Sequence, residues 1–157
     1  MAESVKGARL APFVKAGQYD ALMLFKDAGL VAASAAATVA SAAKVVDVGT
    51  GLFKACMILD VSDLEIASND EIFDIVIQGS PDAAFTDTGV VELAQLSLSA
   101  AEVKRTDCNR DDATGRYKLY FDNEFDGSLY RYIRVYTVVG GTIATGINYS
   151  AYAVPMK

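Results

Sequence analysis

Residues 116–125 read RYKLYFDNEF, a stretch in which apolar and polar side chains alternate. The apolar set is Tyr117, Leu119, Phe121 and Phe125, and the polar set is Arg116, Lys118, Asp122 and Glu124. Because successive side chains of a strand point to opposite faces, this period of two predicts a strand with one buried and one solvated face. Asp126-Gly127 follows at once and is typical of a hairpin turn.

Residues 130–139, YRYIRVYTVV, repeat the alternation with a different second face. One face carries Ile133, Val135 and Val139, and the other carries Tyr130, Tyr132, Arg134 and Tyr136. Tyr and Arg are enriched at protein interfaces, so Tyr132, Arg134 and Tyr136 are candidate partner-binding residues. The alternative is that they cover the second face of a sheet beneath neighbouring loops. Phe121 and Ile133 are expected to be buried on facing positions of the core.

Apolar runs bounded by turn residues also occur in the rest of the chain, and together they predict about eight short strands. The remaining apolar runs are 21–25, 45–48, 55–61, 72–78, 90–98 and 143–154. No convincing amphipathic helix lies among them. Regularly spaced short strands predict an all-β protein, an antiparallel sandwich of the jelly-roll type, with a small barrel as the related solution.

The small-residue stretch from Ala28 to Ala43 is ambiguous. Alanine favours helix, whereas Thr38, Val39 and the valines that follow favour strand. We expect a flexible loop that leads into the strand at 45–48. Sixteen weakly apolar residues are short for a bilayer span, and no membrane partner is expected.

The chain of 157 residues is predicted to consist of an N-terminal arm, 1–18, and one sandwich domain, 19–157. The arm is basic, contains Pro12 and shows no strand alternation, so it has too little apolar surface to fold alone. We expect it to order against a partner. Its expected apolar anchors are Val5, Leu10 and Phe13, and its expected charged contacts are Lys6, Arg9 and Lys15.

The charge balance argues against nucleic acid as a partner. The net charge is −6, from 14 basic and 20 acidic residues, and phosphates repel an acidic chain. No apolar run follows the first basic residues, so a signal peptide is not expected. Cys56 and Cys108 are expected to be reduced thiols, as in a protein made in a cytoplasm.

The absence of histidine removes Ser-His-Asp and Cys-His catalysis and the His clusters of metal-binding barrels. Asp107, Asn109 and Asp111 have the spacing that begins a calcium loop, but Lys118 stands where the bidentate glutamate belongs. The acid pair Asp122 and Glu124 is better explained as a solvated strand face than as a glycosidase pair. We therefore expect no enzyme activity, no cofactor and no metal.

Five segments in this order resemble the jelly-roll cement, or decoration, proteins of tailed-bacteriophage capsids. They are YDALMLFKDA at 19–28, VVDVG at 45–49, IVIQGSPD at 75–82, YRYIRVYTV at 130–138 and AYAV at 151–154. The resemblance covers about residues 19–154. The arm lies outside it.

The resemblance implies a homo-oligomer, a dimer or a trimer, on the outer surface of an icosahedral capsid. It would bridge subunits of the major capsid protein and stabilise the shell of the virion after synthesis in the host bacterial cytoplasm. Two alternatives remain open at this point: a carbohydrate- or receptor-binding sandwich of a phage particle, and a small hydrolase.

Overall fold

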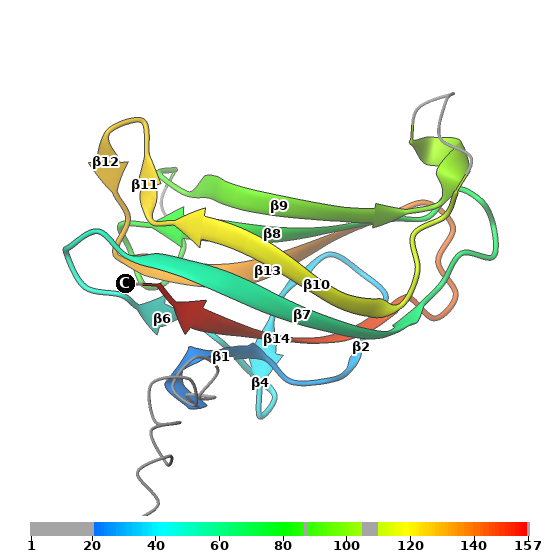
Figure 1. The fold of residues 1–157 in the computed structure, drawn as a ribbon, viewed down its shortest axis with the longest axis horizontal. Helices are drawn as coiled ribbons and strands as arrows, with labels where there is room; N and C mark the ends of the chain where they lie inside the picture. The colour runs from blue at the N-terminus through cyan, green and yellow to red at the C-terminus, as the bar shows by residue number, and fades with distance from the viewer. Residues whose placement is uncertain (1–20, 87, 105–109, 157) are drawn as a thin grey trace, which may run out of the picture.

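Two antiparallel β-sheets face each other in a computed structural model that describes residues 21–86, 88–104 and 110–156 (Figure 1). Helix in these residues is confined to two 3-10 turns, η1 (Ala21–Met23) and η2 (Ala101–Val103). The prediction of an all-β sandwich is therefore confirmed. None of the described helices is long and apolar enough to cross a membrane.

Each sheet is built from long strands flanked by short ones. Sheet A has the order β1 (Leu24–Lys26), β14 (Ile147–Pro155), β7 (Lys54–Leu64) and β10 (Gly115–Asp122), with β2 (Leu30–Val31) also beside β14. Sheet B has the order β3 (Ala35–Ala36), β13 (Tyr132–Gly140), β8 (Ile72–Ser80) and β9 (Val91–Ser99), with β6 (Val46–Asp47) also beside β13.

The strand pairs are nested. If β1 with β2 and β3 with β6 each count as one position, the sandwich has eight positions in chain order. The first position pairs with the eighth, the second with the seventh, the third with the sixth and the fourth with the fifth. The pairs β7–β14 and β8–β13 then join these units into two sheets. This nested order is that of a double-sheet jelly roll.

The core lies between the sheets and is filled from both. Phe121 on β10 is 7% exposed and Ile133 on β13 is fully buried, so the two predicted core residues meet the same cluster from opposite sheets. Phe25 on β1 is also fully buried there. The alternation predicted for residues 116–122 and 132–137 is confirmed by these burial patterns.

The strand predicted for residues 116–125 extends too far at its C-terminal end. β10 stops at Asp122, and a separate hairpin of β11 (Glu124–Phe125) and β12 (Ser128–Leu129) follows. Asp126 and Gly127 have φ values of 50° and 74°, the two positive angles that the predicted tight turn requires. Because the hairpin leaves the sheet, Phe125 is 48% exposed, and its assignment to the apolar face was wrong.

The alanine-rich stretch forms paired strands, so the prediction of a flexible loop was wrong. Beyond β2 and β3 it contains the small hairpin of β4 (Thr38–Val39) and β5 (Ala42–Ala43). The Ala37 amide donates to the Val135 carbonyl at 2.9 Å, which fixes the stretch along the edge of sheet B. Pairing with β13 and β14 supplies the backbone hydrogen bonds that propensity alone did not predict.

The buried side chain of Glu71 fixes the turn at residues 67–70, which precedes β8 (Ile72–Ser80). Glu71 is fully buried, and its side chain accepts hydrogen bonds from the amides of Ala67 at 2.6 Å, Ser68 at 2.5 Å and Asp70 at 3.1 Å. Burial alone would raise the pKa of Glu71, but these hydrogen bonds to the charged form outweigh it and lower the pKa.

Acidification is expected to destabilise the protein through this glutamate. A carboxyl whose folded-state pKa lies below its unfolded value stabilises the fold fully above the ordinary value of 4.5, and this contribution is lost as the pH falls through the lowered pKa. In thermal melts from pH 7 to pH 3, Glu71→Gln should start less stable than the wild type and lose less stability on acidification. The exposed Glu92→Gln should follow the wild-type curve, and identical curves for all three proteins would contradict the assignment.

Candidate interaction surface

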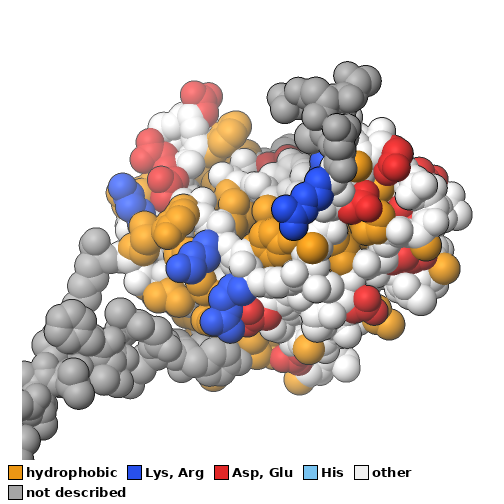
Figure 2. Space-filling view, turned by 45° about the vertical axis from the view of Figure 1, so that its right-hand side comes forward, with side chains coloured by type: hydrophobic (Ala, Val, Ile, Leu, Met, Phe, Trp, Pro, Cys, Tyr) orange, Lys and Arg blue, Asp and Glu red, His pale blue; other side chains and the backbone are white. Residues whose placement is uncertain are grey.

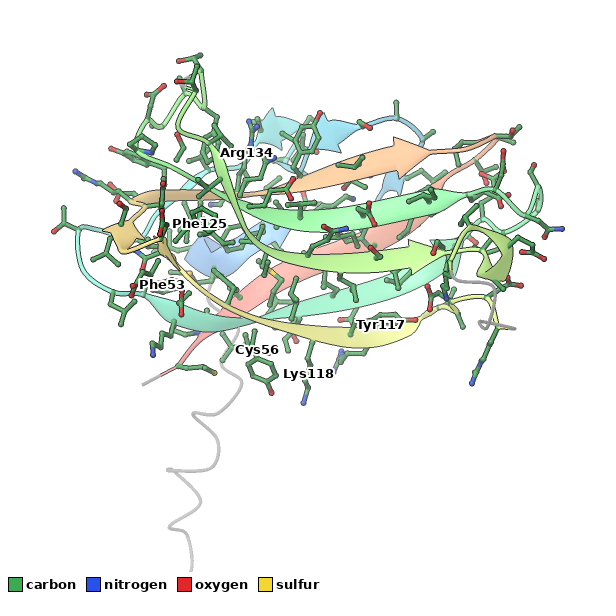
Figure 3. The ribbon with its side chains drawn as sticks, turned by 90° about the horizontal axis from the view of Figure 1, so that it is seen from above. Phe53, Cys56, Tyr117, Lys118, Phe125 and Arg134 are labelled. Atoms are coloured by element: carbon green, nitrogen blue, oxygen red, sulfur yellow. The ribbon has the colours of Figure 1, made fainter. Side chains whose placement is uncertain are left out.

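Arg134 lies near the start of β13 on the outer face of sheet B and points away from the core (Figure 3). Its Nε donates to Gln78 Oε1 at 2.9 Å. The guanidinium carbon lies 4.2 Å from the Phe85 ring centroid and 5.3 Å from that of Tyr136, so cation–π contacts join the loop after β8 to the sheet. Burial lowers the pKa of Arg134, and Tyr136 opposes this.

Tyr132 lies on the same face and is engaged with its neighbours along the chain and in β6. The Arg131 guanidinium lies 5.3 Å from the Tyr132 ring centroid and binds Asp47 through contacts of 2.8 and 2.7 Å. The hydrogen bond from Arg131, followed by that from the Gly49 amide, lowers the pKa of Asp47 to about 2.

The structure therefore brings Tyr132, Arg134 and Tyr136 together on one face, half-buried, as the alternation predicted. Arg134 holds a loop of its own chain through Phe85, and Tyr136 contacts Arg134, which favours the alternative that these side chains lie beneath neighbouring loops. A partner-binding role for these three residues stays a prediction. The six arm residues assigned to partner binding lie outside the described residues: Val5, Lys6, Arg9, Leu10, Phe13 and Lys15.

The outer face of sheet A is a second surface, and here the central strand is apolar on both sides. Ala55, Met57 and Leu59 point into the core and are fully buried, whereas Cys56 and Ile58 point outward and are only 8% exposed each. Figure 3 shows Cys56 and Lys118 directed to the outside of sheet A.

The strand register arranges this outer face as rows across β10, β7 and β14. One row contains Tyr120, Cys56 and Val154, and the next contains Lys118, Ile58 and Tyr152. Cys56 and Ile58 therefore form an apolar floor, with the side chains of β10 on one side and those of β14 on the other. Tyr120 stands beside this floor at 62% exposed, an unusual exposure for a large aromatic side chain.

Charged residues form the rows on either side of these two. Arg116 and Asp60 form a two-point ion pair, with Nε–Oδ1 at 2.6 Å and Nη2–Oδ2 at 3.0 Å. At the other end Asp122 lies opposite Lys54 in the register. Figure 2 shows lysine and arginine side chains interleaved with hydrophobic ones over one side of the molecule. An apolar centre with a polar rim is the usual composition of a protein–protein interface.

Sequence reasoning missed this surface because it treated Arg116, Lys118 and Asp122 as a solvated strand face. The available signal was the uninterrupted apolar run ACMIL at 55–59. A run without alternation indicates a strand that is covered on both faces.

The described residues show little that could act on a substrate. No group of three or more His, Cys, Asp or Glu side chains is placed to hold a metal ion within the described ranges. Asp111 accepts from the Ala101 amide at 2.8 Å, and Asp112 accepts from Ser99 and pairs with Lys104, so both carboxylates are used in local structure. Asp107, Asn109 and Cys108 lie outside the described residues, and Cys56 is a buried free thiol.

A cavity of about 430 Å³ lies beneath the alanine-rich stretch, lined mainly by small side chains and backbone. The one cation in its lining is Lys26, which is 5% exposed. Its Nζ donates to the carbonyls of Asp27, Gly29 and Tyr149 at 2.9, 2.9 and 3.0 Å, which uses all three of its donors. Lys26 therefore holds the turn after β1 and has no donor left for a ligand.

A comparison of the chain with protein-family models and with curated proteins finds no match.

Proposed function

We propose that this chain is a cement protein that binds the outer surface of a tailed-phage capsid and bridges neighbouring major capsid subunits. The observation that carries the proposal is the nested eight-position jelly roll, the architecture that the resemblance implied. The composition supports it, because an acidic chain without histidine suits a protein partner better than nucleic acid or a catalytic role.

The carbohydrate-binding alternative has less support in the geometry. Sugar sites commonly offer an aromatic platform, whereas the cavity beneath the alanine-rich stretch is lined by alanines and by other aliphatic, hydroxyl and charged side chains, with no aromatic side chain among its lining residues. Tyr120, the most exposed aromatic side chain of the described core strands, lines a hollow of about 380 Å³ with Lys54, Leu93, Phe121, Asp122 and Met156, and it is the one exposed aromatic side chain among them.

Deletion of residues 2–16 tests the arm within this proposal. Shells of a tailed phage that encodes this chain, prepared without it, would be mixed with the full-length or the truncated protein. We expect the truncated protein to melt normally but to decorate the shells at lower occupancy in electron micrographs and to protect them less against heat. Equal occupancy and protection would place attachment in the sandwich. Absence of binding by the full-length protein would overturn the proposed function itself.

A further inference from the structure

The outer face of sheet A differs in charge from the chain as a whole. In the four rows that join β10 to β7 it carries three basic side chains, Lys54, Arg116 and Lys118, and two acidic ones, Asp60 and Asp122, on a chain with a net charge of −6. A third carboxylate, Asp63, is exposed further along β7. Two copies of an acidic chain repel each other over most of their surfaces. This face is one where two copies can approach without that repulsion.

The charges on this face also change sign from one end to the other along each strand. On β10 the order is Arg116, Lys118, Tyr120, Asp122, and on β7 it runs in the opposite direction from Lys54 to Asp60. Of these four rows the outer two are charged on both strands, and the middle two contain Tyr120, Cys56 and Ile58 together with Lys118.

A twofold axis across the strands, between the Lys118 row and the Tyr120 row, makes the face complementary to itself. It places Arg116 of one copy against Asp122 of the other, and Asp60 against Lys54, on both sides of the axis. Lys118 comes over the ring of Tyr120, a cation–π arrangement, and Ile58 meets Cys56. Two sheets that pack face to face with aligned strands allow this superposition.

We propose that a second copy of this chain binds the outer face of sheet A through this twofold axis, with Tyr120 at the centre of the interface. A closed dimer needs such an isologous surface, in which one patch serves both subunits. The outer face of sheet B is less suited, because the loop after β8 already occupies part of it through the contact of Phe85 with Arg134. The inference deepens the proposed function by naming the surface that joins the copies.

Sedimentation equilibrium of the purified full-length chain tests the inference without any shell, so it can fail while shell binding stands. The wild type should sediment at about twice the 16.7 kDa of one chain. Tyr120→Glu should weaken association at least tenfold with an unchanged melting profile of the monomer, since the side chain is 62% exposed. The matched control is Leu52→Glu, at 53% exposed outside this face, which should remain a dimer.

A charge exchange tests the axis itself. Arg116→Glu with Asp60→Lys keeps the ion pair within the chain and the net charge, but it puts like charges opposite each other across the axis. Adding Lys54→Glu and Asp122→Arg restores opposite charges at every contact. We expect the double variant to dissociate and the quadruple variant to associate again. A monomeric wild type, a dimer that Tyr120→Glu leaves intact, or a double variant that associates as the wild type does would each overturn the proposal.

Discussion

Asn123→Ala is expected to lower the free energy of unfolding by about 3 kcal/mol, because an unpaired buried polar group costs roughly 1–3 kcal/mol and this change leaves several. Asn123 is fully buried between β10 and β11. Its Oδ1 accepts from the Phe53 amide at 2.7 Å, and its Nδ2 donates to the carbonyls of Gly51 at 3.0 Å and Tyr130 at 3.1 Å. Chemical denaturation of the purified variant measures the loss.

Asn123→Asp separates the hydrogen bonds from the volume of the side chain. It keeps an acceptor for Phe53 but turns an oxygen toward the carbonyls of Gly51 and Tyr130, so it should be at least as destabilising at neutral pH as Asn123→Ala. Glu124→Ala, one residue on and exposed, should change stability by no more than about 0.5 kcal/mol. If Asn123→Ala lowered the free energy of unfolding as little as Glu124→Ala does, the hydrogen bonds of Asn123 to Gly51, Phe53 and Tyr130 would not stabilise the fold.

Phe121→Ala is expected to cost about 3–5 kcal/mol, the range for removing a large aromatic side chain from a packed core. Phe121 is 7% exposed and its ring centroid lies 6.2 Å from that of Phe53 at an interplanar angle of 56°. The loss combines the transfer of the ring to water with the cavity that remains between the two sheets. Urea denaturation should show a lower midpoint with an unchanged slope.

Asp122→Ala is the control that tests which residues of β10 point into the core, because Asp122 is the next residue after Phe121 and points to the opposite face. Asp122 is half-buried, and within the described residues its Oδ1 accepts a hydrogen bond from the Glu124 amide at 3.1 Å. In the Tyr120→Glu background, where the chain is expected to be monomeric, the change should cost no more than about 0.5 kcal/mol. Equal losses for Phe121→Ala and Asp122→Ala would mean that the two faces of β10 are assigned the wrong way round.

Alternation was sufficient to predict which side of β10 and β13 faces the core, because the period of two is a property of the strand itself. It could not predict Asn123. The groups that Asn123 binds in Gly51 and Phe53 lie about seventy residues earlier in the chain, and no local pattern records a contact at that distance. In the sequence, a polar residue at an inward position suggests that the strand has ended. In the fold, Asn123 binds Gly51, Phe53 and Tyr130 and so connects β10 to the segments on either side of it.

The prediction for the alanine-rich stretch was wrong, and the apolar floor of Cys56 and Ile58 was not predicted, for a related reason. Whether small residues form strands depends on the neighbours that pair with them, and β13 and β14 lie about a hundred residues further along the chain. Among the outward side chains of β7, Cys56 and Ile58 are covered, and their neighbours across the sheet belong to β10 and β14. Strand order is a property of the whole chain, so composition and periodicity predicted the sandwich but not which surface it would leave apolar.

The nested pairing of the jelly roll also has a consequence for the order in which the chain folds. The innermost pair, β8 with β9, joins segments close in sequence, whereas Leu24 of β1 pairs with Tyr152 of β14 across nearly the whole domain. Loop-closure entropy grows with the length of chain enclosed, so the pairs should close from the inside outward, and a fold rich in distant contacts should form in milliseconds to seconds. In pulsed hydrogen exchange during refolding, the amides of β8 should gain protection first and those of β1 last.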